Sequence, residues 1–195
     1  MTQIAETQIR NITGTPIAPI LADRWSPRGF DASHEISRDD LLSIVEAARW
    51  APSAGNTQPW AFIAARRGTP EFNTIAGSLA GFNSAWAGRA SALIVFATIP
   101  ARGQKMARWN EYDLGQAAAS ATVQAEYLGL RVHQMGGFDA NVIRDGLELS
   151  DDVNPLTVMA IGAYDDSDSV PAEIAQRDLA DRRRLPLEQV VLVSF

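Results

Sequence analysis

The segment 51–60 (APSAGNTQPW) constrains the fold of this chain more than any other part of it. Two prolines and a glycine fix its backbone, and small and amide side chains such as Ser53 and Asn56 stand between the prolines. A stretch with helical spacing precedes the segment and a short apolar run follows it, so the sequence predicts a helix-to-strand connection here. Two interpretations stay open: an ordinary connection, or a loop that presents hydrogen-bonding groups to a flat polar ligand.

Three helices and a glycine turn are predicted from local patterns. The helix before segment 51–60 begins near Ser37, because residues 37–40 (SRDD) resemble a capping box with acidic residues in the first turn, and Pro52 ends it. The longest helical pattern covers residues 112–130 and is rich in alanine, which suits a core centre or a subunit interface. Residues 134–139 then predict a glycine turn whose last residue, an aspartate, caps a shorter helix.

Three short apolar runs, at residues 60–65, 92–98 and 156–162, predict buried strands. Residues 1–22 are interpreted as an irregular arm, since prolines interrupt any helix there, and residues 23–195 as one domain. The apolar, β-branched end at 187–195 predicts a further strand. That strand pairs either within its own sheet or with a second copy of the chain.

Composition excludes several classes of function. The chain has no cysteine, so disulfides and thiolate chemistry are excluded. A net charge of -6 argues against a nucleic-acid partner. The first residues show no signal-peptide pattern, and no apolar run approaches the roughly 20 residues needed to span a bilayer, so we expect a cytoplasmic protein with no membrane partner.

Few side chains offer chemistry of their own. The two histidines, His34 and His133, are far apart in sequence and lack a neighbour at metal-ligand spacing, so no metal site is expected. His133 stands beside a predicted turn and is interpreted as a structural histidine. No serine-nucleophile elbow or phosphate-binding P-loop motif occurs. An enzyme of this kind takes its reactivity from an organic cofactor.

Arginines gather at Arg24 with Arg28 and at residues 182–184, which in an acidic protein indicates a small anionic ligand. A solvated surface run is the other interpretation of residues 182–184. Flavin mononucleotide (FMN) is a ligand that these residues could bind, because arginines bind its phosphate and Ser and Asn side chains can hydrogen-bond to its ribityl chain. Gly136 and Gly137 allow the close backbone approach that its ring requires.

Several segments together, in the same order, resemble the nitroreductase family of FMN-dependent oxidoreductases. The resemblance covers about residues 24–193, and the P-S-x-x-N-x-Q-P-W pattern is fairly specific for that family. The segments are RWSPRGF at 24–30, the loop 52–60, YDLG at 112–115 with LGL at 128–130, MGGFD at 135–139 and RRRLPL at 182–187.

The resemblance implies an α+β fold with a mixed, mostly antiparallel sheet flanked by helices. It also implies an intertwined homodimer with two FMN sites at the interface, in which the C-terminal segment adds to the partner's sheet. The residues that it assigns to cofactor binding are Arg24, Ser26, Arg28, Pro52, Ser53, Ala54, Asn56, Asn83, Gln134, Met135, Gly136, Gly137, Arg182 and Arg184.

Roles follow from the same resemblance. Residues 52–56 would come from the partner subunit, residues 134–137 would lie against N5 of the ring, and Arg182 with Arg184 would hold the phosphate, where arginine forms bidentate bonds that lysine cannot. Arg28 would stand by the pyrimidine side of the ring, where negative charge develops on reduction. No side chain is expected to act as a catalytic acid or base.

The expected function is hydride transfer from NADPH or NADH through FMN to a nitroaromatic, quinone or similar acceptor. Three alternatives stay open: a flavoenzyme of the same fold with one dedicated substrate, a non-catalytic FMN carrier or sensor, and a protein-interaction surface without flavin. Trp86, Trp109 and Tyr112 either shape the substrate pocket or pack in the core.

Overall fold

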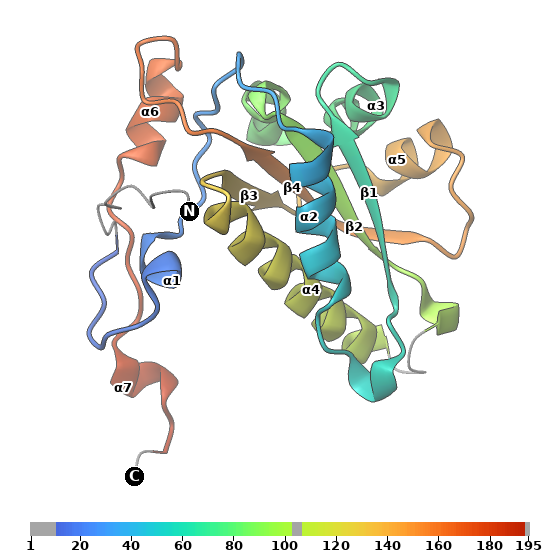
Figure 1. Ribbon diagram of the computed structural model, residues 1–195, viewed down its shortest axis with the longest axis horizontal. Coiled ribbons are helices and arrows are strands. Elements are labelled where there is room, and N and C mark those ends of the chain that lie inside the picture. Colours follow the sequence, from blue (N-terminus) through green and yellow to red (C-terminus); the bar gives the residue numbers. More distant parts are fainter. Residues whose placement is uncertain (1–10, 103–106, 194–195) are drawn as a thin grey trace.

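A four-stranded antiparallel sheet forms the centre of the described part of the chain, residues 11–102 and 107–193, in the computed structural model (Figure 1). The strands are β1 (Trp60–Arg66), β2 (Ala92–Thr98), β3 (Arg131–Met135) and β4 (Asn154–Gly162), in the order β1-β2-β4-β3. Trp60 pairs with Thr98, and Ala92 with Ile161. The three predicted strands are confirmed, as is the antiparallel character of the sheet. Among the described strands no parallel pair occurs, so the parallel part of the expected mixed sheet is not seen there.

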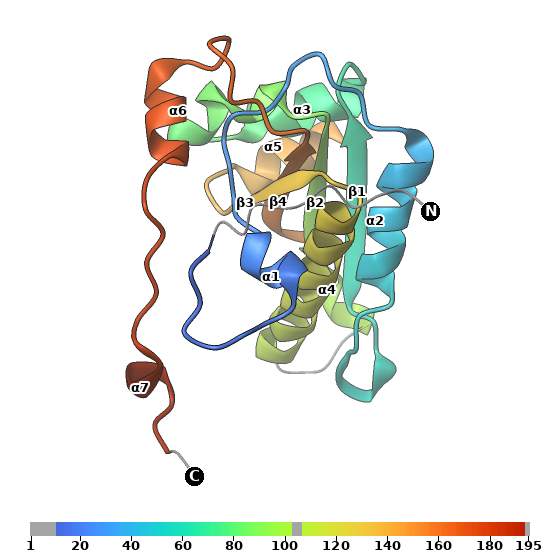
Figure 2. The same ribbon diagram turned by 60° about the vertical axis from the view of Figure 1, so that its left-hand side comes forward.

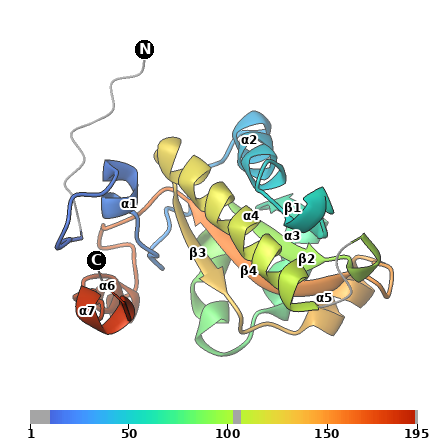
Figure 3. The same ribbon diagram turned by 90° about the horizontal axis from the view of Figure 1, so that it is seen from below.

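Helices cover both faces of the sheet (Figures 1 and 3). One face carries α2 (Arg38–Arg49) and α4 (Ala107–Tyr127), and the other carries α3 (Pro70–Ser78) and α5 (Ala140–Gly146). All residues of β2 are buried, and they alternate between the two layers: Ile94 and Phe96 join the cluster under α2 and α4, whereas Leu93 and Val95 join the other. Both faces of β2 are covered by helices, which is why its sequence is apolar without alternation.

Capping explains where two helices begin. Ser37 is the N-cap of α2, and its Oγ accepts a hydrogen bond from the backbone N–H of Asp40 at 3.0 Å. Asp139 caps α5 in the same way, with its Oδ1 accepting from the N–H of Asn141 at 2.9 Å. Both predicted starts are confirmed. The predicted turn at 134–139 was partly wrong, because Gln134 and Met135 belong to β3.

Among the described residues, four short 3₁₀ helices complete the connections: η1 (Ala54–Asn56), η2 (Gly81–Ala85), η3 (Ala87–Arg89) and η4 (Pro100–Arg102). Within the described residues, no helix has the length and apolar character that crossing a membrane demands.

The two ends of the chain differ from the sequence-based expectation. Residues 1–10 of the predicted arm lie outside the described residues, and its end forms helix α1 (Pro19–Asp23), which Pro19 starts at a position where a missing N–H costs nothing. The predicted boundary at residue 22 falls inside α1 and stays a prediction. After α6 (Ala172–Asp178), the chain extends away from the sheet and forms the short helix α7 (Leu187–Val190) (Figure 2).

The predicted strand at 187–195 is therefore a helix over Leu187–Val190 in this single chain. Among residues 187–193 no pairing with a strand is seen, and residues 194–195 lie outside the described part. Leu187, Val190, Leu192 and Val193 are exposed. A strand needs a partner edge, and the chain's own sheet does not supply one to this segment.

Candidate cofactor site

A cavity of about 300 Å³ lies between the segment that follows α1 and the end of α6. Its lining residues are Arg24, Trp25, Ser26, Arg28, Arg177, Asp178, Ala180, Asp181, Arg182 and Arg184. Five of them are arginines and two are aspartates, so the cavity carries an excess of positive charge. The structure thus brings together five of the predicted cofactor residues, which come from segments about 150 residues apart.

A buried tryptophan anchors the first arginine segment. Trp25 is 2% exposed, and its ring packs edge-to-face against Tyr164 with centroids 4.9 Å apart. The guanidinium of Arg182 lies over the Trp25 ring, 4.9 Å from its centroid. Arg24 Nη1 donates a hydrogen bond to Ser26 Oγ at 3.2 Å. Trp25 therefore serves as the platform on which the two arginine segments meet.

Asp178 fixes the backbone at Arg28. Its carboxylate accepts hydrogen bonds from the N–H of Arg28 at 2.8 Å and from the N–H of Gly29 at 2.7 Å, and it lies 3.8 Å from the Arg28 guanidinium. The Asp178 side chain is 1% exposed, so these charge-assisted bonds lie out of water. Neither Asp178 nor Arg177 was predicted from the sequence. In a sequence, charged residues in the last turn of a short helix look the same as charged residues on a helix face that is exposed to solvent.

A second group of predicted residues meets at the end of β3. Asn83 Nδ2 donates a hydrogen bond to the carbonyl oxygen of Gly137 at 3.1 Å, and a Cβ on Gly137 would lie only 3.0 Å from that nitrogen. Gly136 is exposed and a Cβ there would meet nothing within 4 Å. Gln134 is exposed on the edge strand, whereas the Met135 side chain is buried in the core. For Met135 the backbone is therefore the part that can contact a cofactor.

Arg177 connects the two groups. It lines the cavity, and its guanidinium lies 4.2 Å from the centroid of the Phe82 ring, next to Asn83. The arginine cavity and the Asn83–Gly137 contact are therefore neighbours on one side of the molecule. Together they offer cationic side chains at one end and an open backbone edge at the other.

His133 is held as a structural residue, as predicted. Its Nδ1 lies 2.9 Å from the carbonyl oxygen of Pro27, which can only accept, so Nδ1 carries the proton. Burial lowers the pKa of His133, which favours the neutral ring. The ring also contacts Trp86, with centroids 4.6 Å apart, and Trp86 is 1% exposed. Of the two interpretations of Trp86, core packing is the one that the structure bears out.

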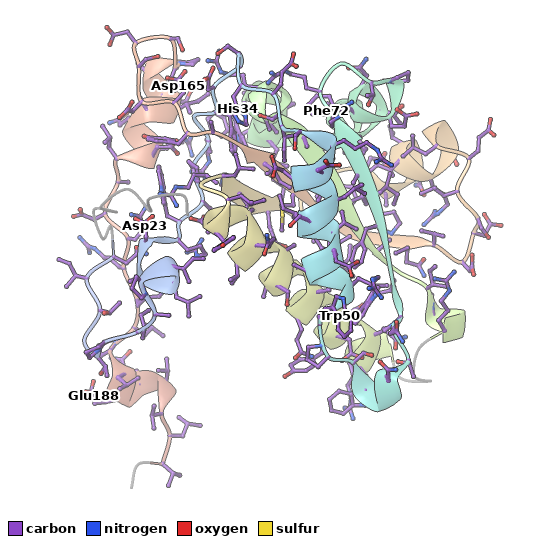
Figure 4. The ribbon with its side chains drawn as sticks, viewed as in Figure 1. Asp23, His34, Trp50, Phe72, Asp165 and Glu188 are labelled. Carbon is purple, nitrogen blue, oxygen red and sulfur yellow. The ribbon has the colours of Figure 1, made fainter. Side chains whose placement is uncertain are left out.

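The loop at residues 52–56 lies away from the cavity. Figure 4 shows Trp50, just before this loop, at the lower end of α2, well apart from Asp23, the neighbour of Arg24, which lies by α1. Ala54 N–H donates a hydrogen bond to Asp113 Oδ2 of α4 at 2.9 Å, and Ser53 Oγ accepts one from Gln58 N–H at 3.0 Å. One chain therefore does not unite Pro52, Ser53, Ala54 and Asn56 with the arginines.

The backbone of this loop is unusual. Gly55, Asn56 and Gln58 all have positive φ, at 61°, 54° and 51°. Non-glycine residues adopt that conformation rarely, and they do so more often at binding loops than elsewhere. Trp109 and Tyr112 of the nearby helix α4 are both exposed, with ring centroids 6.5 Å apart, so they are not core residues in this chain.

Comparison with known proteins identifies the family. The model of the nitroreductase family matches residues 21–71 and 66–163. A solved structure described as an oxidoreductase containing FMN superposes with a TM-score of 0.83 and 32% identity, covering 93% of each chain. An uncharacterised 15.4 kDa protein of Mycolicibacterium smegmatis is 37% identical over 141 residues, which is 68% of this chain and 95% of that protein.

Relatives named for an activity match over shorter stretches. The oxygen-insensitive NADPH nitroreductase of Helicobacter pylori (strain ATCC 700392 / 26695) is 46% identical over 44 residues, 23% of this chain and 21% of that enzyme. A nitroreductase family protein from Streptococcus pneumoniae TIGR4 shares the fold, with a TM-score of 0.71 at 19% identity. The family model, the full-length structural match and the arginine cavity agree, and this chain belongs to the nitroreductase family.

Proposed function

We propose that this protein is a homodimeric enzyme that carries hydride from NADPH or NADH through FMN to a nitroaromatic, quinone or similar acceptor. The observation that carries the proposal is the cavity in which Arg24, Arg28 and Arg182 converge. Arg177 also lines the cavity and stacks on Phe82, next to the Asn83–Gly137 contact. The phosphate of FMN needs cationic side chains, and its flat ring with polar edges needs accessible backbone groups close to those side chains. The residues of this chain therefore fit FMN.

The enzyme class and the cofactor are those of the family: the chain is an FMN-dependent NAD(P)H oxidoreductase. When bound, FMN supplies the hydride chemistry that no side chain of this protein can supply. The protein contributes binding, orientation and charge. The specific acceptor and the choice between NADPH and NADH belong to the proposal.

At the anionic end, we assign phosphate binding to Arg24, Arg182 and Arg184, with Ser26 as an additional hydroxyl donor. A guanidinium presents several N–H groups in one plane and binds phosphate through two of them at once. The neighbouring Asp181 and Asp178 keep the cavity from becoming a site for any polyanion, since they offset part of its charge.

At the ring end, we assign Arg28 to the pyrimidine side and the backbone of residues 134–137 to the region near N5. A cation beside the ring favours the reduced, more negative state, and Asp178 holds the Arg28 backbone in place for that role. Asn83 braces the carbonyl of Gly137, so the neighbouring backbone is fixed before any ligand arrives. The cytoplasmic location stays a prediction.

The dimer completes the set of predicted residues. Helix α4 exposes Tyr112, Gly115, Ala119 and Val123, which are small or apolar residues along one face. The tail beyond α6 exposes a further apolar stretch that extends from the sheet (Figure 2). A second copy packed on α4 would cover this face and bring its own residues 52–56 toward the cavity, which one chain cannot do.

The absorbance spectrum of the purified protein is the first test. A yellow protein that bleaches rapidly when NADPH or NADH is added without oxygen, and regains colour with a nitroaromatic or quinone, supports the proposal. A yellow protein that stays yellow points to an FMN carrier or sensor instead. A colourless protein that takes up no FMN on reconstitution contradicts the proposal altogether.

A panel of acceptors then separates a broad reductase from an enzyme with one dedicated substrate. Comparable kcat/KM values for several nitroaromatics and quinones support the broad acceptor range. One acceptor class that is reduced far faster than the rest, such as an α,β-unsaturated ketone, favours the dedicated enzyme.

A further inference from the structure

Asn11 hydrogen-bonds to both arginine segments of the cavity. Its Nδ2 donates to the carbonyl oxygen of Arg24 at 2.9 Å, and its Oδ1 accepts from Arg182 Nε at 2.8 Å. The backbone N–H of Asn11 donates to Ala22 at 3.1 Å, which holds the residue against α1. The two partners fix the orientation of the amide, since Nε can only donate and a carbonyl can only accept.

This contact joins three parts of the chain that are remote in sequence. Asn11 precedes α1, Arg24 follows it, and Arg182 lies beyond α6; in Figures 1 and 2 the segment before α1 runs beside the segment after α6. The Trp25 ring supports the Arg182 guanidinium from one side, and Asn11 holds its Nε. Both of these neighbours are uncharged, and both act on the direction of the Arg182 side chain.

We propose that Asn11 is a positioning residue for the phosphate end of the cofactor cavity, acting through Arg182 and the backbone of Arg24. The inference rests on the proposed function and extends it to a residue of the N-terminal arm. An arginine that is already oriented loses less side-chain entropy when it binds an anion. Without Asn11, Arg182 loses one of the contacts that orient it before the ligand binds.

Riboflavin, which has the ring and ribityl chain of FMN without its phosphate, separates positioning from general support. We expect Asn11→Ala to weaken FMN binding about ten-fold, as for loss of a hydrogen bond to a charged group, and to leave riboflavin binding within about two-fold. Both dissociation constants are measured by flavin fluorescence on apoprotein. Asn73→Ala, on the exposed face of α3, is the matched control and should change neither value.

A double variant tests the route through Arg182. In an Arg182→Ala background, Asn11→Ala should weaken FMN binding clearly less than it does in the wild-type background, because only the hydrogen bond to the Arg24 backbone remains to be lost. Equal effects of Asn11→Ala in both backgrounds would overturn the inference, as would equal loss of FMN and riboflavin. If Asn11→Ala does not fold, Asn11→Leu, which keeps a similar side-chain volume and loses both hydrogen bonds, replaces it and should weaken FMN binding selectively.

These measurements also distinguish a failure of this inference from a failure of the proposed function. A wild-type protein that binds neither flavin refutes the proposed function and this inference with it. A wild-type protein that binds FMN, with an Asn11→Ala variant that binds it equally well, refutes the inference and leaves the proposed function standing.

Discussion

The carboxylate of Asp178 lies 2.7 Å from the backbone nitrogen of Gly29 and thereby ties the end of α6 to the segment that carries Arg28. The contact requires glycine, because a Cβ at position 29 would lie 2.7 Å from the carbonyl oxygen of Asp165 and 3.3 Å from Asp178 itself. The buried carboxylate of Asp178 thus depends on the glycine at position 29 and holds the backbone of Arg28, a candidate ligand-binding residue.

Removal of this carboxylate should damage both stability and binding. Asp178→Ala leaves the N–H groups of Arg28 and Gly29 without their buried acceptor, and we expect a loss of about 3 kcal/mol in the free energy of unfolding, measured with urea. Asp181→Ala, which removes an exposed carboxylate from the same cavity, should cost less than about 0.5 kcal/mol. Similar values for the two variants would contradict the assigned role.

The two glycines after β3 should respond differently to a methyl group. Gly136→Ala meets no protein atom within 4 Å, so we expect an unchanged melting temperature together with weaker FMN binding, since the methyl group would intrude where the ring is assigned. Gly137→Ala would press on Asn83 and should lower the melting temperature as well. Differential scanning fluorimetry and an FMN titration check both. Full FMN affinity in Gly136→Ala would remove Gly136 from the site.

Arg28 should influence the reduction of the cofactor. Arg28→Ala is expected to weaken FMN retention about ten-fold or to slow reduction by NADPH to a similar extent, because the cation beside the ring is lost. Arg28→Lys should recover part of the effect, since it restores the charge without the planar fork. Stopped-flow absorbance gives the rate, and Arg66→Ala at the exposed end of β1 is the control. A variant with full occupancy and an undiminished rate would refute this role.

The contribution of Glu126 to stability should fall as the pH rises from about 4.5 toward neutrality. Glu126 of α4 pairs with Arg131, which also binds Asp23 at 2.7 Å, but Glu126 Oε1 is buried without a partner in the described residues. Burial raises the pKa of Glu126 from 4.5 to about 7. At pH values between these two pKa values, the folded state binds more protons than the unfolded state. Glu126 therefore changes the free energy of unfolding by up to about -1.4 kcal/mol per pH unit.

Urea titrations at several pH values measure this slope. Glu126→Gln removes the titration and should flatten the dependence, whereas Glu111→Gln, at an exposed position of the same helix, should preserve it. An unchanged slope in Glu126→Gln would show that the carboxylate ionises normally in the folded protein.

The exposed face of α4 should govern assembly. Ala119→Arg places a long charged side chain in the middle of that face and is expected to convert a dimer to a monomer, observed by light scattering after gel filtration. Ala32→Arg, at an exposed loop position, should leave the mass unchanged. Removal of the chain from Val190 onward should also weaken the dimer. A monomeric wild-type protein would contradict the proposed assembly.

Local patterns in the sequence determined the main elements. The capping signal at Ser37, the apolar run of β2 and the aspartate cap at Asp139 act over a few residues, so they hold in almost any context. The arginine segments and the glycine pair were also recognised as candidate site residues from their types and order. The strand β3 was missed because its five residues include polar side chains and only three residues separate it from the long helix α4.

Tertiary structure decided which of those residues meet. Asp178 and Asn11 look like ordinary polar residues in sequence, and their roles arise from partners 149 and 171 positions away. The short helix α7 replaces the predicted strand because a segment with high β propensity forms a strand only when it can pair with a sheet edge. The chain's own sheet does not offer an edge there. The sequence alone therefore determined local conformation and the kinds of chemistry present, whereas long-range packing determined where a charge is buried and which arginines share a cavity.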